Sequence, residues 1–219
     1  MEYGGELFGL NSNRPFTGVD CQLPADWELY RSGRDALKAF ARLADRRRVW
    51  MPALCCASMI LPFTQNGYEV GFYRLRDDYS ADMEDIRAKL NSGDVLLYMR
   101  YFGIRPFPDA FLEEQRRHGV LLLEDRTHDI WVSRADGDFR PDAAVASLRK
   151  WAALPEGGML RTQLGSCPMK TDSRYGDMRL DAMEKKSRYL ETDEEVLNTE
   201  AREEYRQAEN SASPLVVLS

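Results

Sequence analysis

The sequence predicts an α/β protein, with a three-layer α/β/α arrangement around a mostly parallel, mixed sheet. Between residues 32 and 125, apolar runs typical of strands alternate with stretches of helical periodicity. Two of these runs, 95–102 and 120–125, are apolar along nearly their whole length, as strands buried on both faces are. After residue 125 the apolar segments shorten and follow one another without helices, which predicts that the last strands join by hairpins.

Each expected element has its own start or stop signal. Ser32 is a suitable cap for a first helix that begins at Gly33 and runs through RDALKAFARLAD. Pro52 stops the strand that follows, and glycines end the later helices. The expected strands are 49–51, 69–75, 95–102, 120–125, 130–132, 143–148 and 158–161. The expected helices between them are 57–66, one within 77–93, and 109–119.

Composition divides the chain into three segments. Residues 1–31 are rich in Gly, Asn and Pro and predict an irregular N-terminal arm, with a short strand possible at its end. Residues 32–172 carry the alternating pattern and form the large domain. Residues 173–219 are highly charged and predict two solvated helices, with a sparse apolar stripe and weak docking.

Charge and composition exclude several classes of function. The 219 residues carry a formal net charge of -6 with acids and bases mixed, which argues against nucleic acid as a partner. No apolar run approaches the roughly 18 residues that span a bilayer, so no membrane is expected. The four cysteines form no C-x-x-C pair, and the N-terminus lacks the pattern of a signal peptide. These features predict a cytoplasmic protein and no metal site.

The stretch 120–150 holds the residues that suggest chemistry. Asp125 follows a buried strand, and therefore lies at the sheet edge where α/β proteins bind ligands. A carboxylate at this place suits pyridoxal phosphate (PLP), because it keeps the pyridine nitrogen protonated. His128 can pack near such a ring, while Ser147 and Lys150 follow a strand that leads to the same edge. A lysine among apolar neighbours suits an imine-forming nucleophile.

Each of these residues also has a purely structural reading. Asp125 can cap a loop on which His128 packs, and Lys150 can be a surface lysine after a strand. The N-terminus of the helix at Ser32-Gly33 presents free N–H groups that suit a phosphate, but a capped helix needs no ligand.

An ordered series of motifs between about Arg31 and Arg161 resembles the large domain of fold-type I PLP-dependent transferases. Among these it resembles the DegT/DnrJ/EryC1/StrS aminotransferase family. SGRDAL resembles the phosphate-binding turn of the family, and LLLEDRTHD resembles its E-D-x-x-H/Q motif. SLRKWAALPEGGML resembles the lysine segment with its double glycine. The intervening pieces VWMPALCCASM, GYEVGFYRL and YMRYFG resemble the strands and helix of the family in the same order.

The resemblance implies roles for the residues of the stretch 120–150. Lys150 would bind PLP covalently and act as the general acid and base of transamination. Asp125 would pair with the pyridine nitrogen, and His128 would hold the ring hydroxyl or the orientation of the ring. Ser147 would bind the phosphate.

The resemblance also assigns residues outside that stretch, and the chain departs from the family at several of them. Gly33 and Arg34 would form the phosphate turn, but Arg34-Asp35 stands where the family usually has a hydroxyl residue. Cys56 occupies the position of an aromatic residue over the ring. The spacing from Ser147 to Lys150 is shorter than in most sugar aminotransferases. The small C-terminal domain of the family is missing, or reduced to residues 173–219.

The expected function is therefore that of a PLP-dependent aminotransferase. By resemblance, its substrates would be a nucleotide-linked keto-sugar and an amino acid as amino donor, and it would act as a homodimer. A related dehydratase branch has histidine in place of the lysine that Lys150 retains. The alternative is a truncated or degenerate homologue without transaminase activity, serving as a PLP-binding or interaction protein. A nucleotide-binding α/β domain without PLP is disfavoured, because no glycine-rich dinucleotide fingerprint follows a strand.

Overall fold

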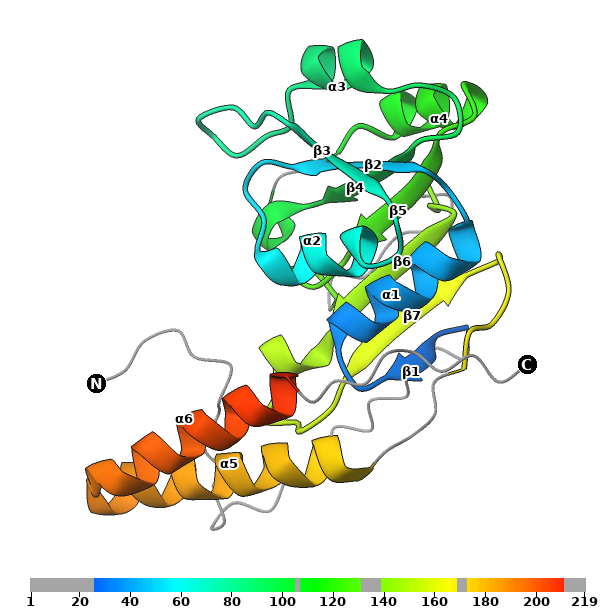
Figure 1. Cartoon of the computed structure of the whole chain (residues 1–219). Coiled ribbons are helices and arrows are strands. Elements are labelled where there is room, and N and C mark those ends of the chain that lie inside the picture. Colours follow the sequence, from blue (N-terminus) through cyan, green and yellow to red (C-terminus); the bar gives the residue numbers. More distant parts are fainter. Residues whose placement is uncertain (1–25, 105–106, 131–138, 169–172, 211–219) are drawn as a thin grey trace.

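The computed structural model describes residues 26–104, 107–130, 139–168 and 173–210, and a single sheet forms its centre (Figure 1). The strands of the sheet are β1 (Glu28–Tyr30), β2 (Arg48–Pro52), β3 (Glu69–Tyr73), β4 (Val95–Met99), β5 (Leu121–Asp125), β6 (Ala143–Ser147) and β7 (Gly158–Thr162). Their order across the sheet is β1-β7-β6-β5-β4-β2-β3. The strands from β6 to β3 are parallel neighbours, whereas β7 lies antiparallel to both β6 and β1. The mixed sheet predicted from the sequence is confirmed.

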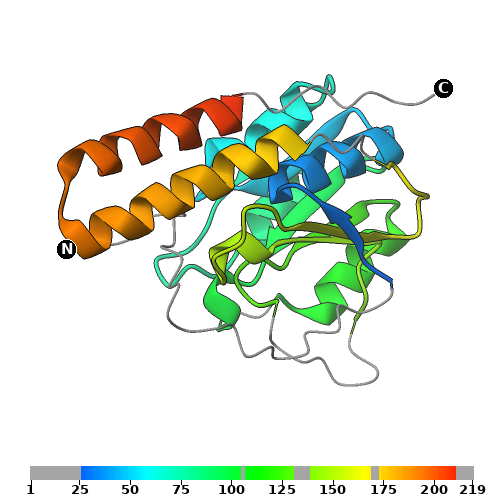
Figure 2. The same cartoon turned by 90° about the horizontal axis from the view of Figure 1, so that it is seen from below.

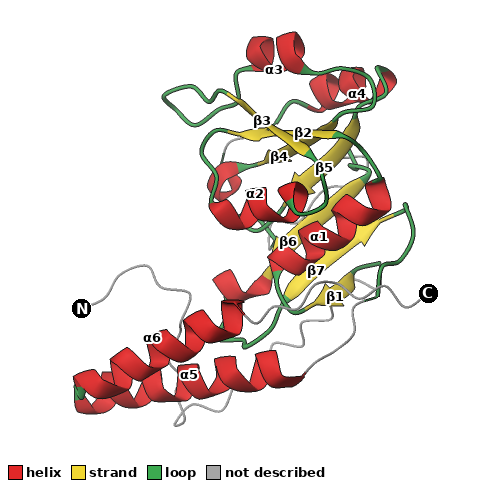
Figure 3. Ribbon diagram, in the orientation of Figure 1, coloured by secondary structure: helices red, strands yellow, loops and turns green. Residues whose placement is uncertain are grey.

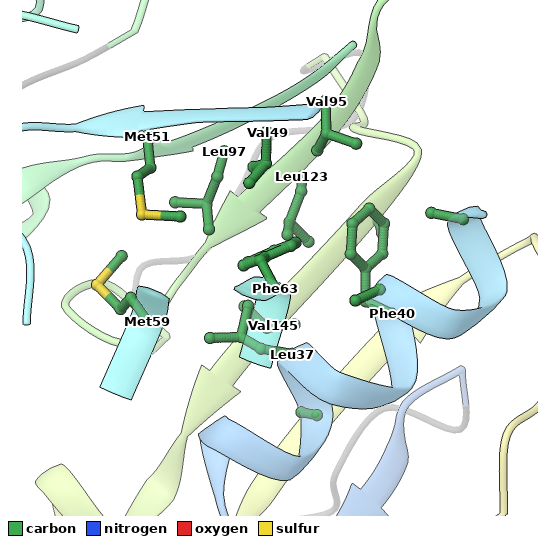
Figure 4. Packing of buried hydrophobic residues seen from close by; sticks show 14 of the residues in the cluster. Leu37, Phe40, Val49, Met51, Met59, Phe63, Val95, Leu97, Leu123 and Val145 are labelled. Atoms are coloured by element: carbon green, nitrogen blue, oxygen red, sulfur yellow. The ribbon is translucent and has the colours of Figure 1, made fainter. Parts of the chain in front are cut away.

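Helices cover both faces of the sheet (Figure 3). They are α1 (Gly33–Ala44), α2 (Ala57–Thr64), α3 (Met83–Lys89) and α4 (Asp109–Arg117). The five residues of β4 are all buried, and they alternate between the two faces. Leu97 packs with residues of α1 and α2 (Figure 4). Leu96 packs with residues of α3 and α4 on the other face. Burial on both faces explains the continuous apolar runs, and the predicted three-layer arrangement is confirmed.

Helix α1 begins where the sequence places it. The Ser32 side chain accepts a hydrogen bond from the Asp35 N–H, which satisfies one of the free donors of the first turn. Leu37 and Phe40 are buried against the sheet, together with alanines that allow the helix to lie close. Helix α1 thereby crosses β6 and β7, and its first turn lies next to the end of β6.

A tight junction joins the start of α1 to the start of β7. Gly158 is buried, and a side chain there would overlap the backbone carbonyl of Ser32. The Gly157 N–H donates to the Arg31 carbonyl at 2.9 Å, and the Gly157 carbonyl accepts from the Leu148 N–H at 2.8 Å. The double glycine therefore holds the α1 turn and the segment after β6 together.

Two expected strands differ from the structure. The strand predicted at 95–102 ends at Met99, and Tyr101–Gly103 form a 3-10 turn in which Phe102 has a φ of 55°. The apolar pattern continues past the point where the chain turns, because Tyr101 and Phe102 face a pocket rather than the sheet. In the strand expected at 130–132, Ile130 lies in a turn, and residues 131 and 132 fall outside the described residues.

The charged C-terminal segment forms two antiparallel helices, α5 (Ser173–Thr192) and α6 (Glu195–Asn210), which lie side by side (Figures 1 and 2). The predicted apolar stripe is partly wrong: Met183 and Leu197 are buried, whereas Leu190 and Val196 are exposed. Neither these helices nor any other helix in the described residues combines the length and hydrophobicity needed to cross a bilayer.

Because the junction leaves no room for a side chain, Gly158→Ala is expected to destabilise the fold. The added methyl group would overlap the Ser32 backbone, so that α1 or β7 must shift, and the free energy of unfolding should fall by about 1–3 kcal/mol. Gly176→Ala is the matched control, because its added carbon meets only the end of the Glu156 side chain at 3.3 Å. Urea denaturation of both variants is the measurement. Equal stability of Gly158→Ala and the wild type would contradict the close packing of Gly158 against the Ser32 backbone.

Candidate functional site

One pocket of about 560 Å³ lies at the carboxyl ends of β4, β5 and β6, beside the first turns of α1 and α2. This is the edge of a parallel sheet at which ligands bind in α/β proteins. The structure brings every site residue selected from the sequence into the lining of this pocket: Gly33, Arg34, Cys56, Asp125, His128, Ser147 and Lys150.

Asp125 is the last residue of β5 and is only 6% exposed. Its Oδ1 accepts a hydrogen bond from the Thr127 N–H at 2.8 Å. Burial raises the pKa of the Asp125 carboxyl, although the hydrogen bonds of Thr127 and the nearby His128 act in the opposite direction. The neighbouring Glu124 is paired with Arg100 at 3.2 Å, so the two adjacent acids of the sequence have different surroundings. Asp125 is thus a buried carboxylate that pairs with no lysine or arginine among the described residues.

His128 is held by two aromatic rings that the sequence analysis did not select. Its imidazole stacks on Phe102 with the ring centroids 4.9 Å apart and an interplanar angle of 10°. The Tyr101 ring is inclined to the imidazole by 62°, with the ring centroids 6.0 Å apart. The Nδ1 atom of His128 is buried and has no hydrogen-bond partner in the described part of the chain. The adjacent aromatic residues Tyr101 and Phe102 are the sequence signal for these rings, but the apolar pattern predicts a strand there.

The phosphate turn predicted at Gly33-Arg34 forms the first turn of α1, which leaves its leading N–H groups without partners inside the helix. A side chain at Gly33 would come within 3.2 Å of the Ser147 Cβ, so the turn and the end of β6 are in close contact. The Arg34 guanidinium, however, donates to the Glu209 carboxylate of α6 at 2.6 Å. The backbone of the turn, rather than the Arg34 charge, therefore suits an anion.

Lys150 ends a 3-10 turn, Leu148–Lys150, that follows β6 directly. Its side chain is exposed and lines the pocket, whereas the preceding Arg149 is buried. The Trp151 indole N–H donates to the Thr127 carbonyl at 2.6 Å. This bond connects the lysine turn to the loop that carries Asp125 and His128.

Cys56 caps the start of α2 and is exposed, with its sulfur 2.8 Å from the Ser58 hydroxyl oxygen. The position that the resemblance gives to an aromatic residue therefore has none. The aromatic rings of the pocket are those of Tyr101 and Phe102 instead.

The buried carboxylate predicts a measurable effect on stability. A folded-state pKa that is raised by burial means that ionisation of Asp125 opposes folding once the pH exceeds its ordinary value of 3.8. Asp125→Asn removes this charge and keeps the oxygen that accepts from Thr127. At neutral pH, without added ligand, it should raise the free energy of unfolding by about 0.5–2 kcal/mol.

This gain should disappear as the pH falls below the ordinary value of 3.8, where the Asp125 carboxyl is neutral in both states. Denaturation at several pH values provides the measurement, and Asp77→Asn on the exposed surface is the control. A destabilising effect of Asp125→Asn at neutral pH would show that the carboxylate has a partner that supports folding.

Comparison with known proteins gives matches at the level of structure alone. No family model matches the chain, and no curated protein matches it in sequence. The 3-amino-5-hydroxybenzoic acid synthase structure is similar, with a TM-score of 0.55 and 20% identity, over 62% of this chain and 38% of that one.

Two further solved structures match the same part of the fold. A putative sugar aminotransferase from Streptococcus pneumoniae, in a PLP form, has a TM-score of 0.52 and 16% identity over 62% of this chain and 41% of its own. GDP-4-keto-6-deoxymannose-3-dehydratase, solved with bound GDP-perosamine, has a TM-score of 0.54 and 16% identity over 62% of this chain and 39% of its own. The present chain thus spans about two fifths of the structures that it matches, and it has the α/β fold of their corresponding part.

Proposed function

We propose that this chain is the cofactor-binding part of a PLP-dependent aminotransferase that acts on a nucleotide-linked keto-sugar, with an amino acid as amino donor. One observation carries the proposal: seven residues chosen from the sequence, between positions 33 and 150, line a single pocket at the carboxyl edge of the sheet. The fold that the chain shares with an aminotransferase in a PLP form supports it. On this proposal, residues 32–172 form the large domain, between an N-terminal arm and the helices of residues 173–219.

The described residues fit PLP on three points. The volume of about 560 Å³ is within the range of small-molecule pockets. Asp125 offers a buried negative charge that a protonated ring nitrogen would neutralise. The first turn of α1 offers N–H groups to a phosphate, and the buried Nδ1 of His128 offers a further hydrogen-bonding atom. When bound, PLP supplies an electron-withdrawing ring that stabilises negative charge on the substrate carbon.

Asp125 would accept a hydrogen bond from the ring nitrogen and keep that nitrogen protonated. Its burial strengthens the pairing, because charges attract more strongly where water is excluded. His128, stacked on Phe102, would hold the ring hydroxyl or fix the orientation of the ring. Asp125 ends β5 and His128 lies in the turn that follows. The Trp151 indole joins this turn to the lysine turn, so both residues keep their position relative to Lys150.

Ser147 would donate its hydroxyl to the phosphate, beside the N–H groups of Gly33 and Arg34. Lys150 would attach the cofactor through its Nζ atom, and the same amine would take a proton from the substrate carbon and return it to the cofactor carbon. Because Lys150 is exposed at the rim, its amine can reach both the pocket and an incoming substrate.

The similar solved structures support the proposed substrate class. One of the similar structures is named as a sugar aminotransferase, and the dehydratase holds a nucleotide-linked sugar. A lysine at position 150, rather than the histidine of the dehydratase branch, favours amino transfer. We further propose a homodimer in the cytoplasm, in which the partner copy completes the open side of each pocket.

A second reading is a homologue that binds PLP without transaminase activity. The ion pair between Arg34 and Glu209 favours it, because this pair takes the guanidinium away from the phosphate turn.

Absorbance spectroscopy of the purified chain with added PLP tests the binding site. We expect a visible band from PLP attached to Lys150, and Lys150→Ala should abolish it. Lys89→Ala is the matched control, because Lys89 pairs with Asp85 away from the pocket and its loss should leave the band unchanged. A wild type without the band would refute covalent PLP binding.

Conversion of the cofactor distinguishes the two readings. The PLP-loaded chain, incubated with a mixture of L-amino acids, should convert PLP to pyridoxamine phosphate, which chromatography detects. Asp125→Asn should slow this conversion by about 10²–10⁴-fold, since the ring nitrogen would lose the charge that keeps it protonated. A wild type that binds PLP but converts none of it would favour the second reading, a homologue that binds PLP without transaminase activity.

A further inference from the structure

The Glu209 carboxylate lies in a cage of donors next to the pocket. Its Oε1 accepts from Arg179 Nη1 at 2.6 Å, from the Tyr175 hydroxyl at 2.9 Å and from Arg149 Nη1 at 3.3 Å. Its Oε2 accepts from Arg34 Nη2 at 2.6 Å. We call the three arginines and Tyr175 the arginine cage. Arg34 and Arg149 also line the pocket, whereas Arg179 and Tyr175 do not, so the cage lies behind the pocket wall.

The cage is largely buried and gathers positive charge around one carboxylate. Arg179 is 0% exposed and Arg149 is 5% exposed, and the guanidinium groups of Arg34 and Arg179 both pair with Glu209. Burial alone would raise the pKa of Glu209, but the surrounding arginines and Tyr175 lower it. Guanidinium groups that converge on one point repel each other, and an anionic ligand relieves this repulsion.

Several donors of the cage are not satisfied by Glu209. Arg34 Nε and the Nε and Nη2 atoms of Arg179 are buried and make no hydrogen bond within the described residues. A carboxylate offers two oxygens, and both already accept from the cage. A phosphate offers more oxygens and up to two negative charges, and arginine binds it in the same forked geometry. The cage therefore has more donors than its present occupant uses.

We propose that the arginine cage is a phosphate-binding site beside the pocket, in which Glu209 occupies the place of the ligand. Glu209 precedes Asn210, the last residue of α6, so that opening one helical turn releases its carboxylate. The proposal goes beyond aminotransferase function and does not depend on it, since the cage uses neither Asp125 nor Lys150. A nucleotide-linked substrate or free phosphate would supply the same group.

Titration with inorganic phosphate at constant ionic strength tests the proposal. Glu209→Gln removes the competing charge and should bind phosphate at least about tenfold more tightly than the wild type, as measured by calorimetry. Glu203→Gln is the matched control, because it makes the same change in net charge on the exposed face of α6 and should resemble the wild type. Glu209→Asp keeps the charge but shortens the side chain. Its affinity for phosphate should lie between those of the wild type and Glu209→Gln.

A double variant locates the bound phosphate. Arg179→Gln in the Glu209→Gln background should abolish the gain, because Arg179 belongs to the cage and does not line the pocket. Acetate in place of phosphate should bind Glu209→Gln more weakly, which separates a phosphate site from a carboxylate site. Equal phosphate affinity of the wild type, Glu209→Gln and Glu209→Asp would overturn the proposal. A gain that survives loss of Arg179 would overturn it as well.

Discussion

The candidate site depends on the close packing of the first turn of α1 against the double glycine that begins β7. Gly158 leaves no room for a side chain beside Ser32, and Gly157 bonds to the Arg31 carbonyl on one side and the Leu148 N–H on the other. This contact places the α1 turn, the end of β6 and the lysine turn together. The α1 turn and the chain from β6 to β7, which are far apart in sequence, thus meet at one edge of the sheet.

Much of this arrangement follows from the sequence, because local signals agree with the tertiary structure. The strands buried on both faces are continuous apolar runs. Asp125 ends one of them, and Lys150 ends the 3-10 turn that follows β6. The turn at Tyr101 and Phe102 was missed, since pocket-facing aromatics extend the apolar pattern of β4. Glu209 was missed for a different reason: it lies 175 residues from Arg34, within a segment whose charges predict a solvated surface.

The pocket and the adjacent arginine cage contain features that lower the stability of the folded chain. Asp125 is a buried carboxylate, Phe102 has a positive φ, and the arginine cage holds three guanidinium groups. Each is costly in a folded chain, and such features are typical of functional sites. The apolar layers on both faces of the sheet support these features, because they fix the ends of β4, β5 and β6. Figure 4 shows one of the two layers. The apolar layers of the sheet therefore supply stability, whereas its carboxyl edge carries the costly residues of the site.

On the proposed function, Asp125 and Lys150 both hold PLP in one pocket. Borohydride reduction of the PLP-treated chain, followed by peptide mass spectrometry, tests it most directly, because reduction fixes the cofactor on the lysine that carries it. The account predicts that the modification lies on Lys150 in the wild type and that Asp125→Asn decreases its yield. Modification spread over the surface lysines, with no preference for Lys150, would contradict the account.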